Sequence, residues 1–108
     1  MKNQSSEQIR FFLYLTRDQA AQVGRLRAAG VSASTIARQA IRKYHTSPSL
    51  LIEDDTPRPE RSNAYISVDD AAALDSVALR EGCSRAQALR RIIATYLLTN
   101  ASAIDALF

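Results

Sequence analysis

The fold is decided by two matching segments, GVSASTIARQAIRKY at residues 30–44 and GCSRAQALRRIIATY at residues 82–96. They align without a gap at an offset of 52 residues. The identical positions are Gly30 and Gly82, Ser32 and Ser84, Arg38 and Arg90, Ile41 and Ile93, and Tyr44 and Tyr96. A shared spacing of apolar residues, with glycine and serine at the same positions, indicates an internal duplication over this length. The chain of 108 residues is therefore expected to hold one structural pattern twice.

Each matching segment predicts an amphipathic helix that follows another helix. Its serine is a typical helix cap, and its apolar residues recur at the spacing that places them on one face. The glycine in front suits the end of a helix of about 12 residues, because glycine accepts the left-handed conformation. The predicted buried residues of the preceding helices are Ala20, Val23, Leu26, Ala73, Leu74, Val77 and Ala78. Those of the matching segments are Ile36, Ala37, Ala40, Ile41, Tyr44, Ala88, Leu89, Ile92, Ile93, Tyr96 and Leu97.

An alternating stretch precedes each pair of helices and predicts a β-strand. In the first stretch, Ile9, Phe11, Leu13 and Leu15 oppose Arg10, Phe12, Tyr14 and Thr16; in the second, Ala64, Ile66 and Val68 oppose Asn63, Tyr65 and Ser67. Thr16 and Asp69 are the expected caps of the helices that follow. A lone strand leaves both edges unpaired, so the two strands are expected to pair antiparallel into a ribbon. One face of this ribbon packs on the four helices, and the other stays outside.

The expected fold is mostly α with a short two-stranded antiparallel ribbon, arranged as an intramolecular pseudo-dimer. Residues 1–8 are expected to be disordered, residues 9–45 form the first repeat, and residues 61–98 form the second. Residues 46–60 form the predicted linker, because they contain all three prolines and the acidic run Glu53–Asp55. Residues 99–108 are a tail that is either a short docking helix or loose.

The charge of the chain is small overall but unevenly spread. The net charge is +3, with +6 on residues 1–48, −3 on residues 49–60 and zero on residues 61–108. No apolar run is long enough to span a membrane, and the polar start has no signal core, so a cytoplasmic protein without a membrane partner is expected.

Several kinds of chemistry are not expected from this composition. One cysteine and one histidine cannot supply a usual zinc site, and no Gly-rich phosphate loop occurs. We therefore expect no metal and no cofactor. The absence of a nucleophile–base set and of a paired-carboxylate pocket argues against an enzyme.

In its order of strand, glycine-ended helix and serine-opened second helix, the sequence resembles the ribbon-helix-helix (MetJ/Arc) superfamily of DNA-binding proteins. The resemblance covers residues 9–45 and 63–99, which are most of the chain. Members usually hold one copy and dimerise, and two copies in one chain are similar to the TraY-type proteins of conjugative plasmids. The resemblance implies sequence-specific binding of double-stranded DNA, either as a transcriptional repressor or as an accessory factor of a conjugative relaxosome.

The resemblance also implies how the chain would bind DNA. The ribbon lies in the major groove, and the N-terminus of the second helix of each repeat contacts a phosphate. The implied base contacts are Arg10, Phe12, Tyr14, Asn63, Tyr65 and Ser67. The implied phosphate contacts are Ser32, Ala33, Ser84 and Arg85, mainly through backbone N–H groups, with Arg17, Arg25, Arg27, Lys43 and Arg61 as further candidates. Because the repeats differ, two unlike half-sites are expected, and side-by-side self-association on DNA is a further expectation.

Other interpretations stay open on the sequence alone. The aromatic residues Phe12, Tyr14 and Tyr65 also fit ordinary cross-strand packing, or a protein-interaction module that uses the same scaffold. An antitoxin would combine a DNA-binding ribbon with a tail that binds a toxin, and a relaxase is another candidate partner. Arg38 and Arg90 are expected to be solvated helix residues.

Overall fold

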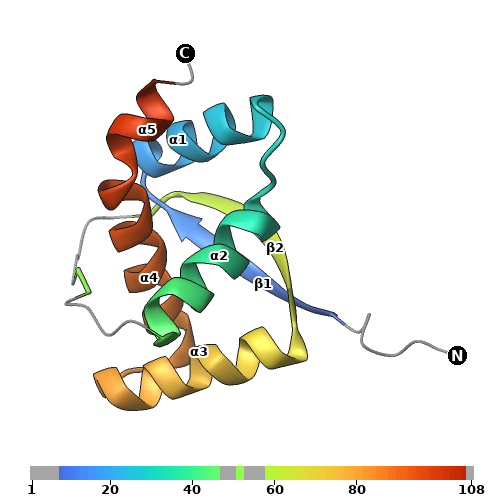
Figure 1. Cartoon of the computed structure of the whole chain (residues 1–108), viewed down its shortest axis with the longest axis vertical. Helices are drawn as coiled ribbons and strands as arrows, with labels where there is room; N and C mark the ends of the chain where they lie inside the picture. Colours follow the sequence, from blue (N-terminus) through green and yellow to red (C-terminus); the bar gives the residue numbers. More distant parts are fainter. Residues whose placement is uncertain (1–7, 47–50, 53–57, 107–108) are drawn as a thin grey trace, which may run out of the picture.

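The computed structural model describes residues 8–46, 51–52 and 58–106 and shows a two-stranded sheet surrounded by helices (Figure 1). The elements in chain order are β1 (Gln8–Leu15), α1 (Arg17–Ala28), α2 (Ala33–Thr46), β2 (Glu60–Ser67), α3 (Val68–Glu81), α4 (Arg85–Thr99) and α5 (Ala101–Asp105). The order of strand, helix and helix therefore occurs twice, followed by one short helix. None of the described helices is both long and apolar enough to cross a membrane.

The strands β1 and β2 pair antiparallel, which confirms the predicted pairing. Ile9 lies opposite Ile66 and Phe11 lies opposite Ala64, so the apolar residues of both strands share one face. On this inner face Leu13, Leu15, Ala64 and Ile66 are buried. The period of two along each strand places the intervening residues on the opposite face.

The core lies between the inner face of the ribbon and the helices. Figure 1 shows α1 and α3 at opposite ends of the molecule, with the ribbon, α2 and α4 between them. The predicted apolar faces of α2 and α4 supply its centre, where Ile36, Ile41, Ile92 and Ile93 are almost fully buried. Each such side chain contributes about 1.5–3 kcal/mol by leaving water. Neither repeat could bury these residues without the other.

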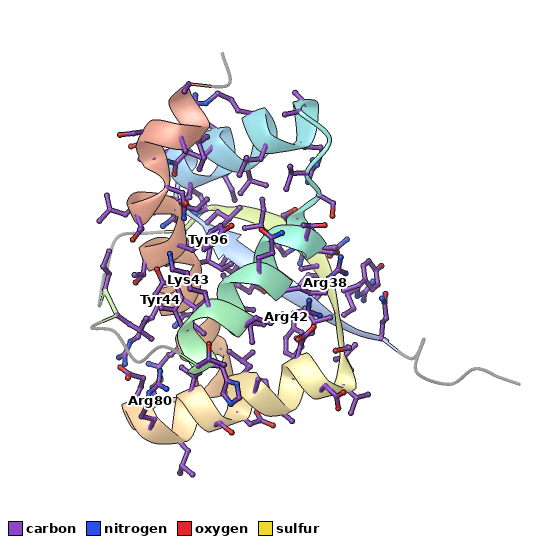
Figure 2. The ribbon with its side chains drawn as sticks, viewed as in Figure 1. Arg38, Arg42, Lys43, Tyr44, Arg80 and Tyr96 are labelled. Carbon is purple, nitrogen blue, oxygen red and sulfur yellow. The ribbon has the colours of Figure 1, made fainter. Side chains whose placement is uncertain are left out.

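Tyr44 and Tyr96, the matched tyrosines of the two repeats, occupy the region between α2 and α4 (Figure 2). Tyr44 is buried, and Tyr96 is half-buried with its hydroxyl donating to Oε1 of Gln39 at 3.0 Å. Burial, and to a smaller extent the neighbouring Tyr44, raises the pKa of Tyr96 above its ordinary value. Both tyrosines are thus part of the packing, as their apolar spacing predicts.

Most helix boundaries follow the predicted caps. The Thr16 hydroxyl accepts the N–H of Gln19 at 3.1 Å, and the Ser84 hydroxyl accepts the N–H of Gln87 at the same distance. Both sites are complete capping boxes, because each glutamine side chain accepts the N–H of its cap residue in return. Gly82 ends α3 with a φ of 66°, the left-handed conformation that glycine accepts at least cost.

The predicted cap at Asp69 is wrong, because α3 begins two residues earlier. Ser67 is the N-cap, and its hydroxyl accepts the N–H of Asp70 at 3.0 Å. Val68 therefore belongs to the helix and is exposed, rather than pointing inward from the strand. Serine and aspartate are similar caps, so local preference alone does not choose between them. A contact to α2 distinguishes the two positions.

That contact is an ion pair between Arg42 of α2 and the buried Asp70 of α3. Arg42 donates from Nε and Nη2 to the two carboxylate oxygens at 3.1 and 3.2 Å. Burial by itself opposes ionisation of Asp70, but the hydrogen bonds from Arg42 and those with Ser67 outweigh it, so the pKa of Asp70 lies below its ordinary value. The ionised carboxylate thus links the start of α3 to α2.

We expect Asp70→Asn to destabilise the protein by about 1–3 kcal/mol near pH 7, since a charge-assisted, bidentate contact is lost. Because the folded-state pKa is depressed, this stabilisation is present above the ordinary pKa of 3.8 and is lost as the pH falls through the folded-state value. Urea denaturation of both proteins at pH 7 and pH 3 measures this, and the difference between them should shrink at the lower pH.

Asp75→Asn is the matched control for this prediction. Asp75 forms a similar bidentate pair with Arg85, but its side chain is 50% exposed, so its loss should cost at most about 1 kcal/mol. Equal destabilisation by the two substitutions would show that burial of Asp70 adds nothing.

The predicted linker and tail are partly structured. Thr46 and Glu60 extend α2 and β2 into the range 46–60. Leu51 is buried, and the N–H of Ile52 donates to Oγ1 of Thr95 at 2.9 Å. The acidic run Glu53–Asp55 lies outside the described residues. Of the range 1–8, only Gln8 is described, and it belongs to β1.

The tail contains α5, which packs against α1 and α4 and buries Ile104. Of the two alternatives for the tail, residues 101–105 therefore form the docking helix. This part of the tail lies on the helical side of the molecule and leaves the outward face of the ribbon open.

Candidate nucleic-acid interface

The outward side chains of the ribbon form an exposed surface, which we call the outer face. It consists of Arg10, Phe12 and Tyr14 from β1 and of Arg61, Asn63 and Tyr65 from β2. The register pairs Arg10 with Tyr65, Phe12 with Asn63, and Tyr14 with Arg61. All six side chains are exposed, and none is a carboxylate. The outer face is therefore positively charged and rich in hydrogen-bond donors.

Phe12 lies at the centre of the outer face, between the two arginines. The Arg10 guanidinium lies 5.1 Å and the Arg61 guanidinium 4.6 Å from the centroid of its ring. Contacts of this kind contribute about 0.5–1 kcal/mol at exposed sites and hold long side chains in place. Arg61, predicted as a phosphate contact, thus belongs to the same surface as the predicted base contacts.

The aromatic residues on the outer face are not packed into the fold. Phe12, Tyr14 and Tyr65 are 38%, 42% and 43% exposed, whereas the aromatic Tyr44 of α2 is 2% exposed. Large rings usually leave water when a protein folds, and aromatic and arginine side chains are enriched in binding surfaces. Exposure of three rings on one face with two arginines thus favours a binding surface over simple cross-strand packing.

Ser67, the sixth predicted base contact, lies at the end of the ribbon and also caps α3. Its alternation with Asn63 and Tyr65 predicts an outward position, but its hydroxyl is occupied in capping α3 and its side chain is half-buried. Ser67 therefore has a structural role as a cap, and its base contact stays a prediction. Its strand partner Gln8 is exposed at this end of the ribbon.

The N-termini of α2 and α4 lie beside the two edges of the ribbon. On the β2 edge, the N–H of Tyr65 donates to Oγ of Ser34 at 2.8 Å. Arg38, labelled in Figure 2, donates from Nη1 to the Tyr65 carbonyl at 3.3 Å. On the β1 edge, a small crevice is lined by residues 12–15 of β1 and by Ala86, Leu89, Arg90 and Ile93 of α4. Each helix therefore presents its first turn next to one strand.

The first turns keep backbone donors available at these edges. The Ser32 hydroxyl accepts the N–H of Thr35 at 3.1 Å, and the capping box of α4 occupies the N–H groups of Ser84 and Gln87. The remaining first-turn N–H groups, those of Ala33, Ser34, Arg85 and Ala86, point out of the helix ends, where the partial positive charge favours anions. Ala33 has no polar side-chain atom, so only its backbone N–H could contact a phosphate, and the residue as a whole is buried.

The side chain of Arg85 is directed away from this role. It donates from Nε and Nη2 to the Asp75 carboxylate at 2.6 and 2.7 Å, and it lies 5.7 Å from the Phe11 ring centroid. The hydrogen bond from Arg85 lowers the pKa of Asp75 and outweighs the opposing effect of burial. A phosphate at Arg85 would therefore contact the backbone first and would have to compete with Asp75 for the guanidinium.

The other basic candidates are only partly gathered at the ribbon. Arg17 is exposed at the junction of β1 and α1, and Nη2 of Arg27 donates to Oγ of Ser62 in β2 at 3.2 Å. Lys43 lies ten residues beyond Ala33 along α2, about 15 Å from the helix end that flanks β2. Arg25 lines a groove between α1 and α4. The structure thus separates Lys43 and Arg25 from the outer face.

Two residues at the ribbon edge were missed from the sequence, Arg38 and Ser34. Arg38 is half-buried against β2 rather than solvated, because its guanidinium reaches the Tyr65 carbonyl.

The strands also carry a sequence signal for the outer face. Aligning the true caps Thr16 and Ser67, at an offset of 51, superposes Arg10 on Arg61 and Tyr14 on Tyr65. The offset of 52 holds only after the first helix of each repeat. The segment from the cap Ser67 to Gly82 is one residue longer than the segment from the cap Thr16 to Gly30.

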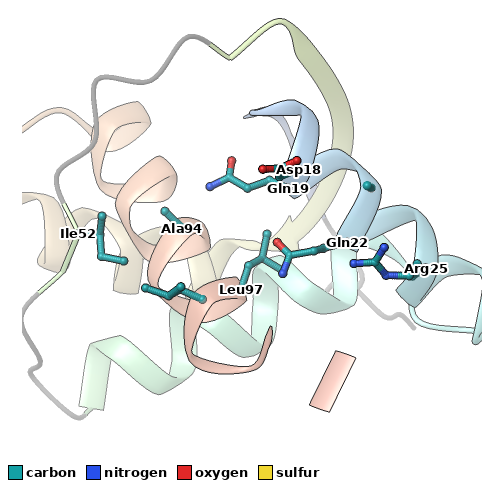
Figure 3. A pocket seen from close by; sticks show the side chains of 9 residues that line it. Asp18, Gln19, Gln22, Arg25, Ile52, Ala94 and Leu97 are labelled. Carbon is teal, nitrogen blue, oxygen red and sulfur yellow. The ribbon is translucent and has the colours of Figure 1, made fainter. Parts of the chain in front are cut away.

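A wider groove lies elsewhere, between α1, α4 and Ile52 (Figure 3). It has a volume of about 510 Å³, with Asp18, Gln19, Gln22 and Arg25 on one wall and Ile52, Ala94, Leu97 and Leu98 on the other. Over the described ranges of the chain, no three His, Cys, Asp or Glu side chains come close enough to hold a metal ion. The groove thus lacks the convergent arrangement of charge that the outer face has.

Comparison of the chain with protein-family models, curated proteins and solved structures gives no match. The geometry of the outer face and of the two helix ends is therefore the basis for a functional proposal.

Proposed function

We propose that this protein is a sequence-specific double-stranded DNA-binding protein of the ribbon-helix-helix type, with its ribbon placed in the major groove. The observation that carries the proposal is the outer face, on which Arg10, Arg61 and Asn63 are exposed with no carboxylate among its six side chains. The major groove is about 12 Å wide and accepts a two-stranded ribbon. Arginine and asparagine are suited to bidentate contacts with guanine and adenine, respectively.

We further propose that the two repeats form an intramolecular pseudo-dimer. When a two-fold axis relates the two strands of an antiparallel ribbon, the residue nearest the axis lies opposite its equivalent on the other strand. At the offset of 51 residues, the counterpart of Phe12 is Asn63, and the register pairs these two residues with each other. The register is thus the one that a two-fold relation between the strands requires.

The helix ends complete the proposed mode of binding. A groove-bound ribbon is bordered by the phosphates of both strands, and the first turns of α2 and α4 lie at its two edges. Free N–H groups and the helix dipole make each first turn an anion site. Of the four predicted phosphate contacts, Ala33 and Arg85 would act through these N–H groups, whereas Ser32 and Ser84 cap the helices beside them. Arg17 and Arg27 stand close enough to the ribbon to assist.

Selection of binding sites from a pool of DNA duplexes with a randomised centre tests the proposal. We expect one enriched motif with two unlike half-sites. In fluorescence anisotropy, affinity for this motif should fall about ten-fold or more between about 50 and about 200 mM salt, as expected when two or more phosphates are neutralised. Absence of any enriched motif, with equal binding to all duplexes or none at low salt, would refute sequence-specific binding.

The biological role within this class stays open between repression and DNA processing. The resemblance to tandem conjugation proteins favours a transcriptional repressor or a relaxosome accessory factor, with a relaxase as partner in the second case. A cytoplasmic location and side-by-side binding of several chains on DNA stay predictions. The selected motif should be searched for in the DNA next to the coding region, which includes neighbouring genes and any origin sequence.

A protein-interaction module is the second candidate, because the three exposed rings of the outer face also suit a protein partner. The two candidates differ in their response to charge. If Arg10→Glu leaves the biological activity intact and Tyr14→Ala abolishes it, the partner is a protein. An antitoxin would lose toxin neutralisation, but not DNA binding, when the chain is shortened to remove α5.

A further inference from the structure

The outer face repeats between the two strands except at its centre. With the caps Thr16 and Ser67 aligned, β1 presents Arg10, Phe12 and Tyr14 where β2 presents Arg61, Asn63 and Tyr65. The outer positions are therefore arginine and tyrosine in both halves. The central position is phenylalanine in one half and asparagine in the other, and these two residues lie directly opposite each other.

This one difference also displaces the two arginines from a symmetric arrangement. Both guanidiniums lie over the same ring, that of Phe12, at 5.1 and 4.6 Å from its centroid. Asn63 has no aromatic ring, so it offers neither arginine a cation–π contact. The positive charge of both halves is consequently drawn toward the β1 side of the ribbon centre.

The two edges of the ribbon also differ in how the neighbouring helix is attached to the strand. Ser34 of α2 accepts the N–H of Tyr65 on the β2 edge, whereas its counterpart in α4, at the offset of 52, is Ala86. An alanine side chain cannot accept a hydrogen bond. The first turn of α4 therefore has no side-chain hydrogen bond to β1 equivalent to the one that links the first turn of α2 to β2.

We propose that Phe12 is a positioning residue that gives this protein a single orientation on DNA. This inference rests on the proposed function. By holding Arg10 and Arg61 over one ring, Phe12 places both guanidiniums toward one half of the site, while Asn63 faces the other half with a bidentate amide suited to adenine. The DNA that fits is a duplex whose flanking contacts are symmetric and whose centre is not.

Phe12→Asn tests the inference directly, because it makes the outward residues of both strands Arg, Asn and Tyr. Phe12 is on the outer face, so the fold should tolerate the change. Each protein is first used to select its own site from the randomised duplex pool. The unaltered protein should select a site with an asymmetric centre, and Phe12→Asn should select a palindrome. The reciprocal variant Asn63→Phe, which places a ring on both strands, should also select a palindrome.

The orientation itself is read by directed cleavage. An iron–EDTA reagent attached to Cys83, the only cysteine of the chain, lies next to Ser84 at the first turn of α4. On its selected site, the unaltered protein should cleave one side at least about ten-fold more than the other, and Phe12→Asn should cleave the two sides within about three-fold. Phe12→Tyr keeps the ring and should keep one-sided cleavage.

A second label position shows that the asymmetry belongs to the complex and not to the reagent. Ala29→Cys in a Cys83→Ser background moves the label to the exposed end of α1, in the other repeat, and should reverse the cleaved side. Specific binding with equal cleavage on both sides by the unaltered protein would overturn the inference and leave the proposed function standing. One-sided cleavage that persists in both Phe12→Asn and Asn63→Phe would also overturn it. Failure of the unaltered protein to select any site would refute the proposed function itself.

Discussion

Replacing Arg10 and Arg61 together by alanine is expected to lower affinity for the selected DNA site at least about thirty-fold. Each arginine that contacts a base bidentately contributes about 1–3 kcal/mol of discrimination, and about 1.4 kcal/mol is a ten-fold change in affinity. Both side chains are exposed and form no ion pair on the outer face, so the folded state should lose little. Anisotropy titration measures the affinity, and thermal unfolding checks the fold.

Lys43→Ala is the matched control for the loss of charge. Lys43 is exposed on α2, away from the helix end that flanks β2, and its ammonium group lies over the Tyr44 ring at 5.6 Å. Its removal should change affinity only a few-fold through the general field. If Lys43→Ala weakens binding as much as Arg61→Ala does, the outer face is not the contact surface. If the double arginine variant binds normally, the proposed mode of binding is wrong.

Ala64→Asp is expected to prevent folding or to lower the melting temperature by at least about 15 °C. Ala64 is fully buried on the inner face of the ribbon, opposite Phe11 and beneath the helices. An unpaired carboxylate at this position costs several kcal/mol, a large share of the roughly 5–15 kcal/mol that stabilises a typical domain. Circular dichroism during heating measures the effect.

The neighbouring substitution Asn63→Asp provides the control for strand orientation. Asn63 points to the outer face and is exposed, so the same new charge should leave the melting temperature within a few degrees. It should nevertheless weaken DNA binding, because a carboxylate would replace the amide that contacts adenine and would be repelled by the negatively charged DNA. Equal thermal destabilisation by the two substitutions would contradict the assignment of inner and outer faces.

Much of the outer face could be predicted from local pattern. Alternation in β1 and β2 separates Arg10, Phe12 and Tyr14 from the apolar residues between them, because successive side chains of a strand point to opposite faces. Ser67 has a second role that alternation does not reveal: a hydroxyl at the end of a strand can also cap the next helix. Whether it does so depends on where the helix begins, which alternation does not determine.

The start of α3 depends on a contact that is distant in sequence. Asp69 and Ser67 are comparable caps by local preference, but Asp70 is paired with Arg42, 28 residues earlier. In the helix that begins at Val68, Asp70 is the third residue, where its carboxylate reaches Arg42 of α2 and its N–H donates to Ser67. The sequence predicts a solvated Arg38 for a similar reason, since the acceptor of its hydrogen bond, the Tyr65 carbonyl, belongs to the other repeat.

By itself, the sequence determined which side chains point outward, where most helices begin, and that one pattern occurs twice. These properties follow from periodicity and capping, which act over a few residues. Only the tertiary structure decided that Phe12 faces Asn63, that both arginines lie over one ring, and that α2 and α4 border opposite strands. Those relations depend on strand register and on packing between repeats about fifty residues apart, where a shift of one residue would change every partner.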